Sequence, residues 1–356
     1  GDHRDLHSFP TRRSSDLMLF TLHPVRVSND LRRLAFWLIG ILFILIIGLR
    51  HEIGGDWDRY ISIYAHHLNS PFNFQNFTSG DYVYESIHWF SLNYLNGVYF
   101  TNLICALIFM SGLIRFCRTM PTPWLAFLVS IPFLVIVVSM GYTRQGAAVG
   151  FLLLALVDLT KGRSFRFYIY IIIGALFHKV LLIMIPIGYL YKMNRFKILN
   201  FITVFSLLLI SGYFLLFDRM EHMVYYYITI KFHHSDGALI RVFMGFVSAI
   251  IFFAFRGKFK EKFYDEKLWL IFSVISVALF PASYFYSTFI DRIAIFFLPL
   301  QLVVLSRIPI LIQSKFNREI FILGVLVVYS SALFVWLNFG NHSNEWLPYQ
   351  NILLAY

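Results

Sequence analysis

The side chains best suited to chemistry begin in one long polar stretch between two apolar runs. This stretch starts Arg50-His51-Glu52-Ile53-Gly54-Gly55-Asp56-Trp57-Asp58-Arg59-Tyr60 and reaches Tyr84-Glu85 further along. The Gly-Gly pair predicts a turn into an amphipathic interfacial helix, on which Asp56 and Tyr60 share one face because residues four apart lie one above the other. A carboxylate with aromatic neighbours is typical of sugar binding. An ordinary membrane-surface helix with an aromatic belt would place the same residue types there.

A single arginine stands between two later apolar runs, in Gly141-Tyr142-Thr143-Arg144-Gln145. One run ends before this segment and the next begins at its end, which predicts Arg144 near a helix N-terminus. Free backbone amides and the helix dipole favour an anion there, and a guanidinium binds phosphate oxygens in bidentate fashion. The alternative is a snorkelling side chain that only marks the end of the helix.

Two further pairs of polar residues interrupt apolar sequence. His178-Lys179 offers a neutral imidazole that can act as a general base or hydrogen-bond donor, although a lone histidine can equally be structural. Asp291-Arg292 begins another apolar run, where the two side chains either pair with each other or contact a ligand. Ionisable groups are costly near hydrocarbon, which favours a function for them.

Composition places the chain in a membrane, because 58% hydrophobic and 19% aromatic residues exceed what a soluble domain of 356 residues can bury. The formal charge of +11 is dispersed over short loops, where it indicates topology and not nucleic-acid binding. Cys105 and Cys117 form no disulfide framework, no set of ligands converges by spacing on a metal, and phosphate-loop, dinucleotide and serine-hydrolase motifs are missing. We therefore expect no metal and no cofactor.

Nine apolar runs are candidate membrane spans. The segment 165–191 has basic residues at both flanks, so we predict two short helices that meet at Phe177-His178-Lys179 and return to the starting face. At about 12 to 14 residues each they reach roughly 20 Å, short of the ~30 Å hydrocarbon core. The fold expected is an all-α polytopic bundle of about 11 membrane segments, with amphipathic loop helices on the outer face. The nine runs are 34–49, 97–114, 122–140, 145–160, 198–217, 240–255, 267–284, 289–306 and 319–337.

The distribution of charge predicts which face is outside. Clusters of Lys and Arg occupy alternate gaps between the apolar runs, whereas the other gaps carry mixed acids, histidines, tyrosines and isolated arginines. Basic loops remain in the cytoplasm, so the polar stretches and the C-terminus are predicted on the outer face.

Residues 1–17 resemble translated sequencing adapter and not a targeting peptide, since they have no apolar central stretch and no small-residue cleavage site. We treat them as an artefactual tail and expect the gene fragment to begin near Met18. The remainder, 18–356, is predicted to form a single integral membrane domain. Its second long outer loop, 218–241, carries Tyr225-Tyr226-Tyr227, which fits an interfacial belt, and His233-His234, which is a weak metal signal.

Taken together, the polar stretches resemble the EpsG-like family of bacterial polysaccharide polymerases, relatives of the Wzy-type polymerases. The resemblance covers most of the chain from about residue 31 onward, and its first stretch is the most specific. Family members have one more span before that stretch, which implies that a native N-terminal span is missing here. The matching stretches are 48–60 with Tyr84-Glu85, Thr143-Arg144-Gln145 and Phe177-His178-Lys179, with Asp291-Arg292 a looser fourth match.

The resemblance implies glycosyl transfer from a polyprenyl-pyrophosphate-linked oligosaccharide. An acceptor hydroxyl attacks the anomeric carbon of the donor, and the lipid pyrophosphate leaves. Repeat units would thus be joined into exopolysaccharide, capsule or O-antigen on the outer face of the bacterial inner membrane. No cofactor is implied, since cleavage of the lipid-linked bond supplies the energy.

Roles for individual residues follow from this reaction. The developing charge on pyrophosphate calls for fixed cations, and the attacking hydroxyl calls for a general base. These side chains are expected to converge on one outward-opening cavity. The pyrophosphate ligand is assigned to Arg144, with Arg50 and Arg292 in support. The general base is assigned to His178, then to Glu85, with Asp56 also a candidate. Other substrate contacts are assigned to Gln145, Tyr60, Tyr84 and Asp291.

Rival functions use similar residues. A lipid-linked oligosaccharide flippase or other secondary transporter would also carry buried arginines, but it would show internal repeats, which are not evident in the sequence. A surface-glycan ligase or acyltransferase would share the acceptor and transfer a whole chain or an acyl group. A structural subunit is disfavoured by the cost of Arg144 and His178 near hydrocarbon. The expected partners are the lipid-linked oligosaccharide, the bilayer, and the chain-length regulator and flippase of the same pathway.

Overall fold

The computed structural model describes residues 29–68, 71–74, 77, 81–95, 97–193, 198–216 and 237–354. Within these ranges the named elements are all helical, and Arg50 and Asn351 form one isolated antiparallel bridge. The all-α prediction is therefore confirmed. The predicted tail at 1–17, the start near Met18 and the polar groups at 225–227 and 233–234 lie outside the described residues.

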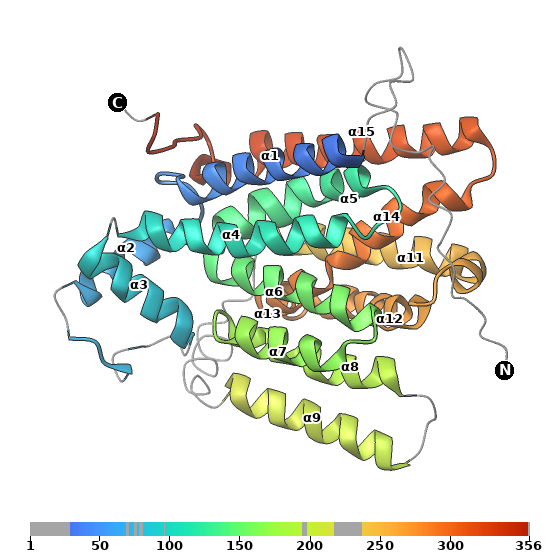
Figure 1. Cartoon of the computed structure of the whole chain (residues 1–356), viewed down its shortest axis with the longest axis horizontal. Helices are drawn as coiled ribbons and strands as arrows, with labels where there is room; N and C mark the ends of the chain where they lie inside the picture. Colours follow the sequence, from blue (N-terminus) through green and yellow to red (C-terminus); the bar gives the residue numbers. More distant parts are fainter. Residues whose placement is uncertain are drawn as a thin grey trace.

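Two closely packed helices form the centre of the bundle, α4 (Val98–Cys117) and α6 (Thr143–Thr160). Gly112 on α4 faces Gly150 on α6 so closely that a Cβ on Gly112 would collide with the backbone of Gly150. Small residues permit this approach, and helices inside a membrane associate largely through such close packing. Helix α1 (Asn29–Gly48) packs against α4, and α5 (Pro123–Ser130) continues into the π-helix η2 (Ile131–Ser139) beside them (Figure 1).

The segment with basic residues on both flanks folds back on itself, as predicted. Helix α7 (Ser164–Ala175) ends before His178, and the chain returns through the 3₁₀-helix η3 (Lys179–Ile183) and α8 (Met184–Lys192). The ring of Phe167, near the start of α7, packs on Gly188, near the end of α8, so the two arms run antiparallel. Helix α9 (Ile198–Leu216) flanks this hairpin at the edge of the bundle (Figure 1).

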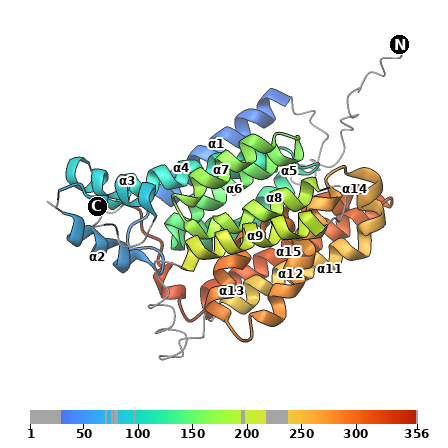
Figure 2. The same ribbon diagram turned by 90° about the horizontal axis from the view of Figure 1, so that it is seen from below.

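The C-terminal half of the chain forms a second group of helices beside the first (Figure 2). It consists of α11 (Ala238–Lys262), α12 (Glu266–Ala282), α13 (Ser287–Ala294), α14 (Pro299–Leu311) and α15 (Lys315–Phe339). Helix α13 runs through the short 3₁₀-helix η6 (Ile295–Phe297) into α14 with a bend of 45°. Pro299 stands at this bend, where its missing N–H interrupts the helical hydrogen bonds.

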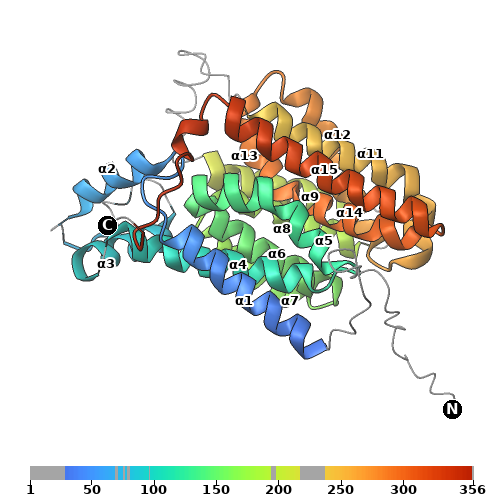
Figure 3. The same ribbon diagram turned by 90° about the horizontal axis from the view of Figure 1, so that it is seen from above.

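Two helices and the C-terminal segment lie together at one end of the bundle. Helices α2 (Trp57–His67) and α3 (Tyr82–Tyr94) extend beyond the ends of α1 and α4. The segment 340–354, with the 3₁₀-helix η7 (Ser343–Glu345), crosses beside them (Figure 3). The predicted helix after the Gly-Gly turn is therefore confirmed as a helix. The polar stretches and the C-terminal segment share one end of the bundle, and that this end is the outer one stays a prediction.

Five of the described helices are long and apolar enough to cross a membrane, namely α1, α4, α6, α11 and α15. The bent pair of α13 and α14 makes a sixth if it is one span. Other predicted runs form shorter apolar helices, such as Pro123–Ser139 and Ser164–Ala175. The expected number of about 11 membrane segments is therefore not confirmed, because a run of this length does not by itself cover the ~30 Å hydrocarbon core.

Candidate functional site

A buried carboxylate, Asp81, joins the two polar residues that the sequence ranked highest. Nη1 of Arg144 donates to Oδ2 of Asp81 at 2.8 Å, and Nδ1 of His178 lies 3.7 Å from the same oxygen. Asp81 is 2% exposed. Arginine, aspartate and histidine thus form one contiguous cluster, which we call the Asp81 cluster.

Each member of the Asp81 cluster comes from a different element, and short backbone contacts hold these elements together. Asp81 directly precedes α3, Arg144 lies in the first turn of α6, and His178 occupies the break between α7 and η3. The amide of Val83 donates to the carbonyl of Leu176, and the amide of Lys179 donates to Oδ1 of Asp81 at 3.3 Å. The break in the α7–α8 hairpin supplies these free backbone groups, which explains why the carboxylate sits there.

The surroundings of Asp81 keep it ionised. Burial raises the pKa of its carboxyl, but contacts with His178, with the guanidinium of Arg144 and with the Lys179 amide outweigh burial and hold the pKa below its ordinary value. Among the described residues, Arg144 hydrogen-bonds through Nη1, and its side chain remains 11% exposed. The other donors of its guanidinium are therefore available to a second anion.

Aromatic side chains from α2 and α3 border the Asp81 cluster. Cζ of Arg144 lies 5.7 Å from the ring centre of Tyr84, and the rings of Tyr84 and Tyr60 are 6.0 Å apart. The hydroxyl of Tyr60 donates to Oδ2 of Asp56 at 3.4 Å, as expected for two residues on one helix face. Burial, followed by the charge of Asp56, raises the pKa of Tyr60 to about 12, so this hydroxyl stays protonated at neutral pH. Asp56 itself is half-buried.

Arg50 is enclosed by protein and contacts Thr143, the residue before Arg144 of the Asp81 cluster. It is 1% exposed, and its guanidinium donates to the carbonyls of Ile47 and Ile53 and, at 2.7 Å, to Oγ1 of Thr143. The Thr143 hydroxyl in turn donates to Asn102 at 3.3 Å. Arg50 therefore holds the residue that starts α6 and leaves Arg144 to face the cluster.

Glu85 and His88 lie on the buried side of α3. Glu85 is 3% exposed and lies one helical turn after Asp81. The backbone amide of Glu85 donates to the backbone carbonyl of Asp81. His88 stacks on Tyr84 with ring centres 5.8 Å apart and approaches Oγ1 of Thr101 at 3.4 Å. Glu85 is thus close to the Asp81 cluster in sequence and in space, and its Oε2 is buried like both ring nitrogens of His178.

The predicted pair at 291 and 292 separates into two different environments. Asp291 forms a bidentate ion pair with Arg241 of α11, in which Nε donates to Oδ1 at 2.7 Å and Nη2 donates to Oδ2. Arg292 is exposed, and its backbone carbonyl accepts a hydrogen bond from Gln145 at 2.9 Å. The two side chains do not pair with each other, because consecutive residues on a helix point in different directions.

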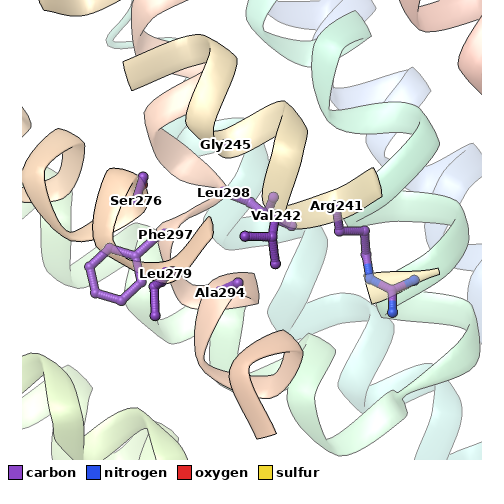
Figure 4. A pocket seen from close by; sticks show the side chains of 8 residues that line it. All are labelled: Arg241, Val242, Gly245, Ser276, Leu279, Ala294, Phe297 and Leu298. Carbon is purple, nitrogen blue, oxygen red and sulfur yellow. The ribbon is translucent and has the colours of Figure 1, made fainter. Parts of the chain in front are cut away.

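The two best-defined cavities lie away from the Asp81 cluster. One, with a volume of about 10 Å³, is lined by residues of α11, α12, α13, η6 and Leu298. Figure 4 shows the guanidinium of Arg241 at one side of it, away from Ser276 and Phe297. The other, of about 270 Å³, is an apolar groove between α11, α14 and α15. The predicted side chains converge on the same end of the bundle, but neither of these cavities is the one the sequence led us to expect.

Two residues of this region escaped the sequence analysis. Asp81 stands where an aspartate ordinarily caps a helix, yet its side chain makes no capping bond to α3 and reaches Arg144, 63 residues away. Arg241, assigned to the end of a loop, lies in the first turn of α11 and neutralises Asp291. A charge count could have signalled both, since each buried charge requires a partner of opposite sign.

Apolar helices around a buried Arg–Asp–His cluster at one end define an integral membrane protein with a polar site. The model of the EpsG family matches residues 33–351, and the chain belongs to the EpsG family. Searches of curated proteins and of solved structures found no match. The resemblance carried by the polar stretches is therefore confirmed, and family membership suggests a function of the polysaccharide polymerase type.

Proposed function

We propose that this protein joins oligosaccharide repeat units, each carried on a polyprenyl pyrophosphate, into a polysaccharide on the outer face of the bacterial inner membrane. The observation that carries the proposal is the Asp81 cluster, in which Arg144 and His178 share one carboxylate oxygen. Such a cluster combines a cation for a leaving phosphate with a base for an attacking hydroxyl. Family membership supports the same class of reaction.

The reaction balances without a further reagent. The acceptor hydroxyl oxygen forms a bond to the anomeric carbon of the donor, the bond from that carbon to the pyrophosphate oxygen breaks, and polyprenyl pyrophosphate leaves with the electron pair. The hydroxyl proton passes to the general base. The free energy of the pyrophosphate linkage drives the step, so the proposal requires neither ATP nor a cofactor.

Arg144 is the proposed pyrophosphate ligand. Its guanidinium uses Nη1 for Asp81, which leaves Nε and Nη2 to approach an anion from the exposed side. A fixed guanidinium aimed at developing charge contributes on the order of 3 kcal/mol to the transition state. Arg292, which is exposed and tied to α6 through Gln145, supplies a second positive charge nearby. Arg50 supports Arg144 through Thr143.

His178 is the proposed general base. Neither of its ring nitrogens has a hydrogen-bond partner among the described residues, and Asp81 lies 3.7 Å from Nδ1, where it can orient the ring and stabilise the imidazolium that forms. Glu85 is the second candidate and Asp56 the third. Tyr60 and Tyr84 are each 1% exposed, so their predicted contact with substrate stays a prediction. We assign Asp291 the task of holding α11 against α13 through Arg241.

The test is the fate of lipid-linked repeat units in cells that carry Arg144→Ala. Single repeat units are expected to accumulate on polyprenyl pyrophosphate in the outer leaflet, and polymer is expected to disappear. Polymer of unchanged length would reject the assignment of Arg144. Accumulation in the cytoplasmic leaflet would favour the flippase, and persistence of polymer that is not attached to its final acceptor would favour the ligase.

A further inference from the structure

The segment that follows α15 is attached to both turns that begin the polar stretches of the site. The amide of Gly54 donates to the carbonyl of Glu345 at 2.8 Å, and the indole Nε1 of Trp346 donates to the carbonyl of Ile136 in η2 at 3.1 Å. Trp346 is 5% exposed. Its ring also packs at 74° against Trp336 of α15, with ring centres 4.8 Å apart.

Two glycines mark how closely this indole approaches the site. A Cβ built on Gly141 would lie 2.7 Å from Cζ2 of Trp346, and the three nearest atoms to it all belong to that ring. A Cβ on Gly55 would lie 3.9 Å from Cη2 of the same ring. Gly141 stands two residues before α6 and three before Arg144, whereas Gly55 directly precedes Asp56. The indole therefore packs against the Gly141 turn. The Gly54–Gly55 turn is held mainly by the preceding residue, because a Cβ on Gly55 would lie 2.7 Å from Oε2 of Glu345, nearer than the indole.

The two turns also contact each other directly. A Cβ on Gly54 would lie 2.5 Å from the carbonyl oxygen of Met140, and Gly54 has a φ of +105° that favours glycine. The turn at 54–55 is thus enclosed between Met140 on one side and the segment 340–354 on the other.

We propose that Trp346 is a positioning residue of the site, whose indole ring fixes the Gly141 turn, and with it Arg144, relative to the Gly54–Gly55 turn and Asp56. This inference rests on the proposed function only for its catalytic consequence. The positioning itself is a statement about two backbone turns and is measurable without substrate.

The first test measures backbone amide exchange with deuterium in the full-length protein in lipid nanodiscs. Trp346→Ala is expected to raise exchange in 52–56 and 139–143. Tyr349→Phe is the matched control, because it removes the hydrogen bond from the Tyr349 hydroxyl to the carbonyl of Ile46, which attaches the same segment to α1 and not to the site turns. Unchanged exchange at both turns in a folded Trp346→Ala protein would overturn the proposal.

The second test is a double-mutant cycle that exploits the contact at Gly141. Gly141→Ala alone places a methyl group against the indole, and displacement of Arg144 by about 1 Å is expected to lower turnover by roughly tenfold to a hundredfold, with a smaller change in KM. In the Trp346→Ala background, the same substitution is expected to change turnover by less than about twofold, because the obstructing ring is gone. Turnover is measured with lipid-linked oligosaccharide extracted from the source cells.

Gly54→Ala serves as the control for the cycle. The new Cβ at position 54 would meet backbone atoms and not the indole, and the φ at this position disfavours alanine. The effect of Gly54→Ala on turnover is therefore expected to be equal in the wild-type and Trp346→Ala backgrounds. An equal effect of Gly141→Ala in both backgrounds would overturn the role of Trp346. If the wild-type protein shows no polymerisation while the exchange pattern is as expected, the proposed function fails and the positioning role stands.

Discussion

The two ends of this bundle both contain a buried arginine–aspartate pair, but one pair is bidentate and the other is monodentate. At the end away from α2 and α3, Arg307 donates to both oxygens of Asp265 at 2.7 Å, and Trp269 donates its indole hydrogen to Oδ2 at 2.8 Å. The ring centre of Phe263 lies 4.2 Å from Cζ of Arg307. At the site end, Arg144 makes one contact with Asp81.

We infer from this difference in geometry that Arg307 stabilises the fold, whereas Arg144 can exchange its anion. In the bidentate pair, both oxygens of Asp265 accept from Arg307 and one also accepts from Trp269, although Nε of Arg307 has no partner among the described residues. The two charges compensate each other within the protein. In the monodentate pair, the guanidinium of Arg144, whose side chain is 11% exposed, retains donors that can bind a phosphate. We therefore interpret Arg307–Asp265 as a structural fastening of α12 to α14, and Arg144–Asp81 as part of the site.

Removal of the arginine of the bidentate pair, Arg307, should cause the largest change in stability. Arg307→Ala leaves Asp265 buried without its cation, and we expect a loss on the order of 3–5 kcal/mol in the free energy of unfolding. Thermal unfolding of the purified protein in detergent measures this loss. Arg256→Ala is the control, because its pair with Glu266 is exposed and should contribute less than about 1 kcal/mol. Equal effects of the two substitutions would remove the structural half of the comparison.

At the site end, substitution of His178 should act on the reaction and not on the fold. His178→Ala is expected to lower turnover by at least roughly 100-fold, the usual contribution of a positioned general base, with little change in thermal stability. His342→Ala provides the control, since that histidine is exposed. A His178→Ala protein with turnover close to that of the wild type would transfer the role of base to Glu85 or Asp56.

Asp81 links Arg144 to His178, and its ionisation predicts that the stability of the protein depends on pH. The pKa of Asp81 is lowered in the folded protein, so its contribution to stability is present above its ordinary value of 3.8 and is lost as pH falls through the folded value. Asp81→Asn is expected to cost about 1.5–3 kcal/mol at pH 7, the range for hydrogen bonds to charged groups. The difference in the free energy of unfolding between Asp81→Asn and the wild-type protein should stay constant between pH 8 and about 5. It should shrink only below about pH 4. A difference that disappears already at pH 6 would mean that another group dominates.

The smallest effect is expected at the edge of the site. Tyr60→Phe removes a 3.4 Å hydrogen bond to Asp56 but keeps the ring against Tyr84, so a change of about 0.5–1.5 kcal/mol in stability is expected. Turnover should fall by less than about tenfold, because a loss of about 1.4 kcal/mol in transition-state stabilisation corresponds to a tenfold change in rate. A loss as large as that of His178→Ala would place Tyr60 in direct contact with the reacting atoms.

Much of the fold and several site positions were predictable from local signals. The gap between apolar runs located the N-terminus of α6, and Thr143 and Arg144 do lie in its first turn. Basic residues on both sides of 165–191 located the break at His178. The Gly-Gly turn located α2. In each example, the residue types within a short segment determine where a helix begins or ends, so no contact between distant parts of the chain had to be known.

The pairing of charges was not predictable, because it depends on how distant helices pack. Neighbouring Asp291 and Arg292 suggested a local pair, but the helix turns them apart and brings Arg241 to Asp291 from 50 residues away. Asp81 reaches Arg144 across 63 residues, and Trp346 approaches Gly141 from the far end of the chain. The predicted number of about 11 membrane segments is not confirmed, since five or six spans are found among the described helices.

The most direct test of the account is turnover per folded molecule of Arg144→Ala protein in lipid nanodiscs, with lipid-linked oligosaccharide from the source cells as substrate. We expect a loss of roughly 100- to 1,000-fold, the range for removal of one preorganised donor to developing charge. The folded fraction should remain above that of Arg307→Ala. Turnover within about twofold of wild type, the scatter between independent sites, would contradict the central claim that Arg144 binds the leaving pyrophosphate.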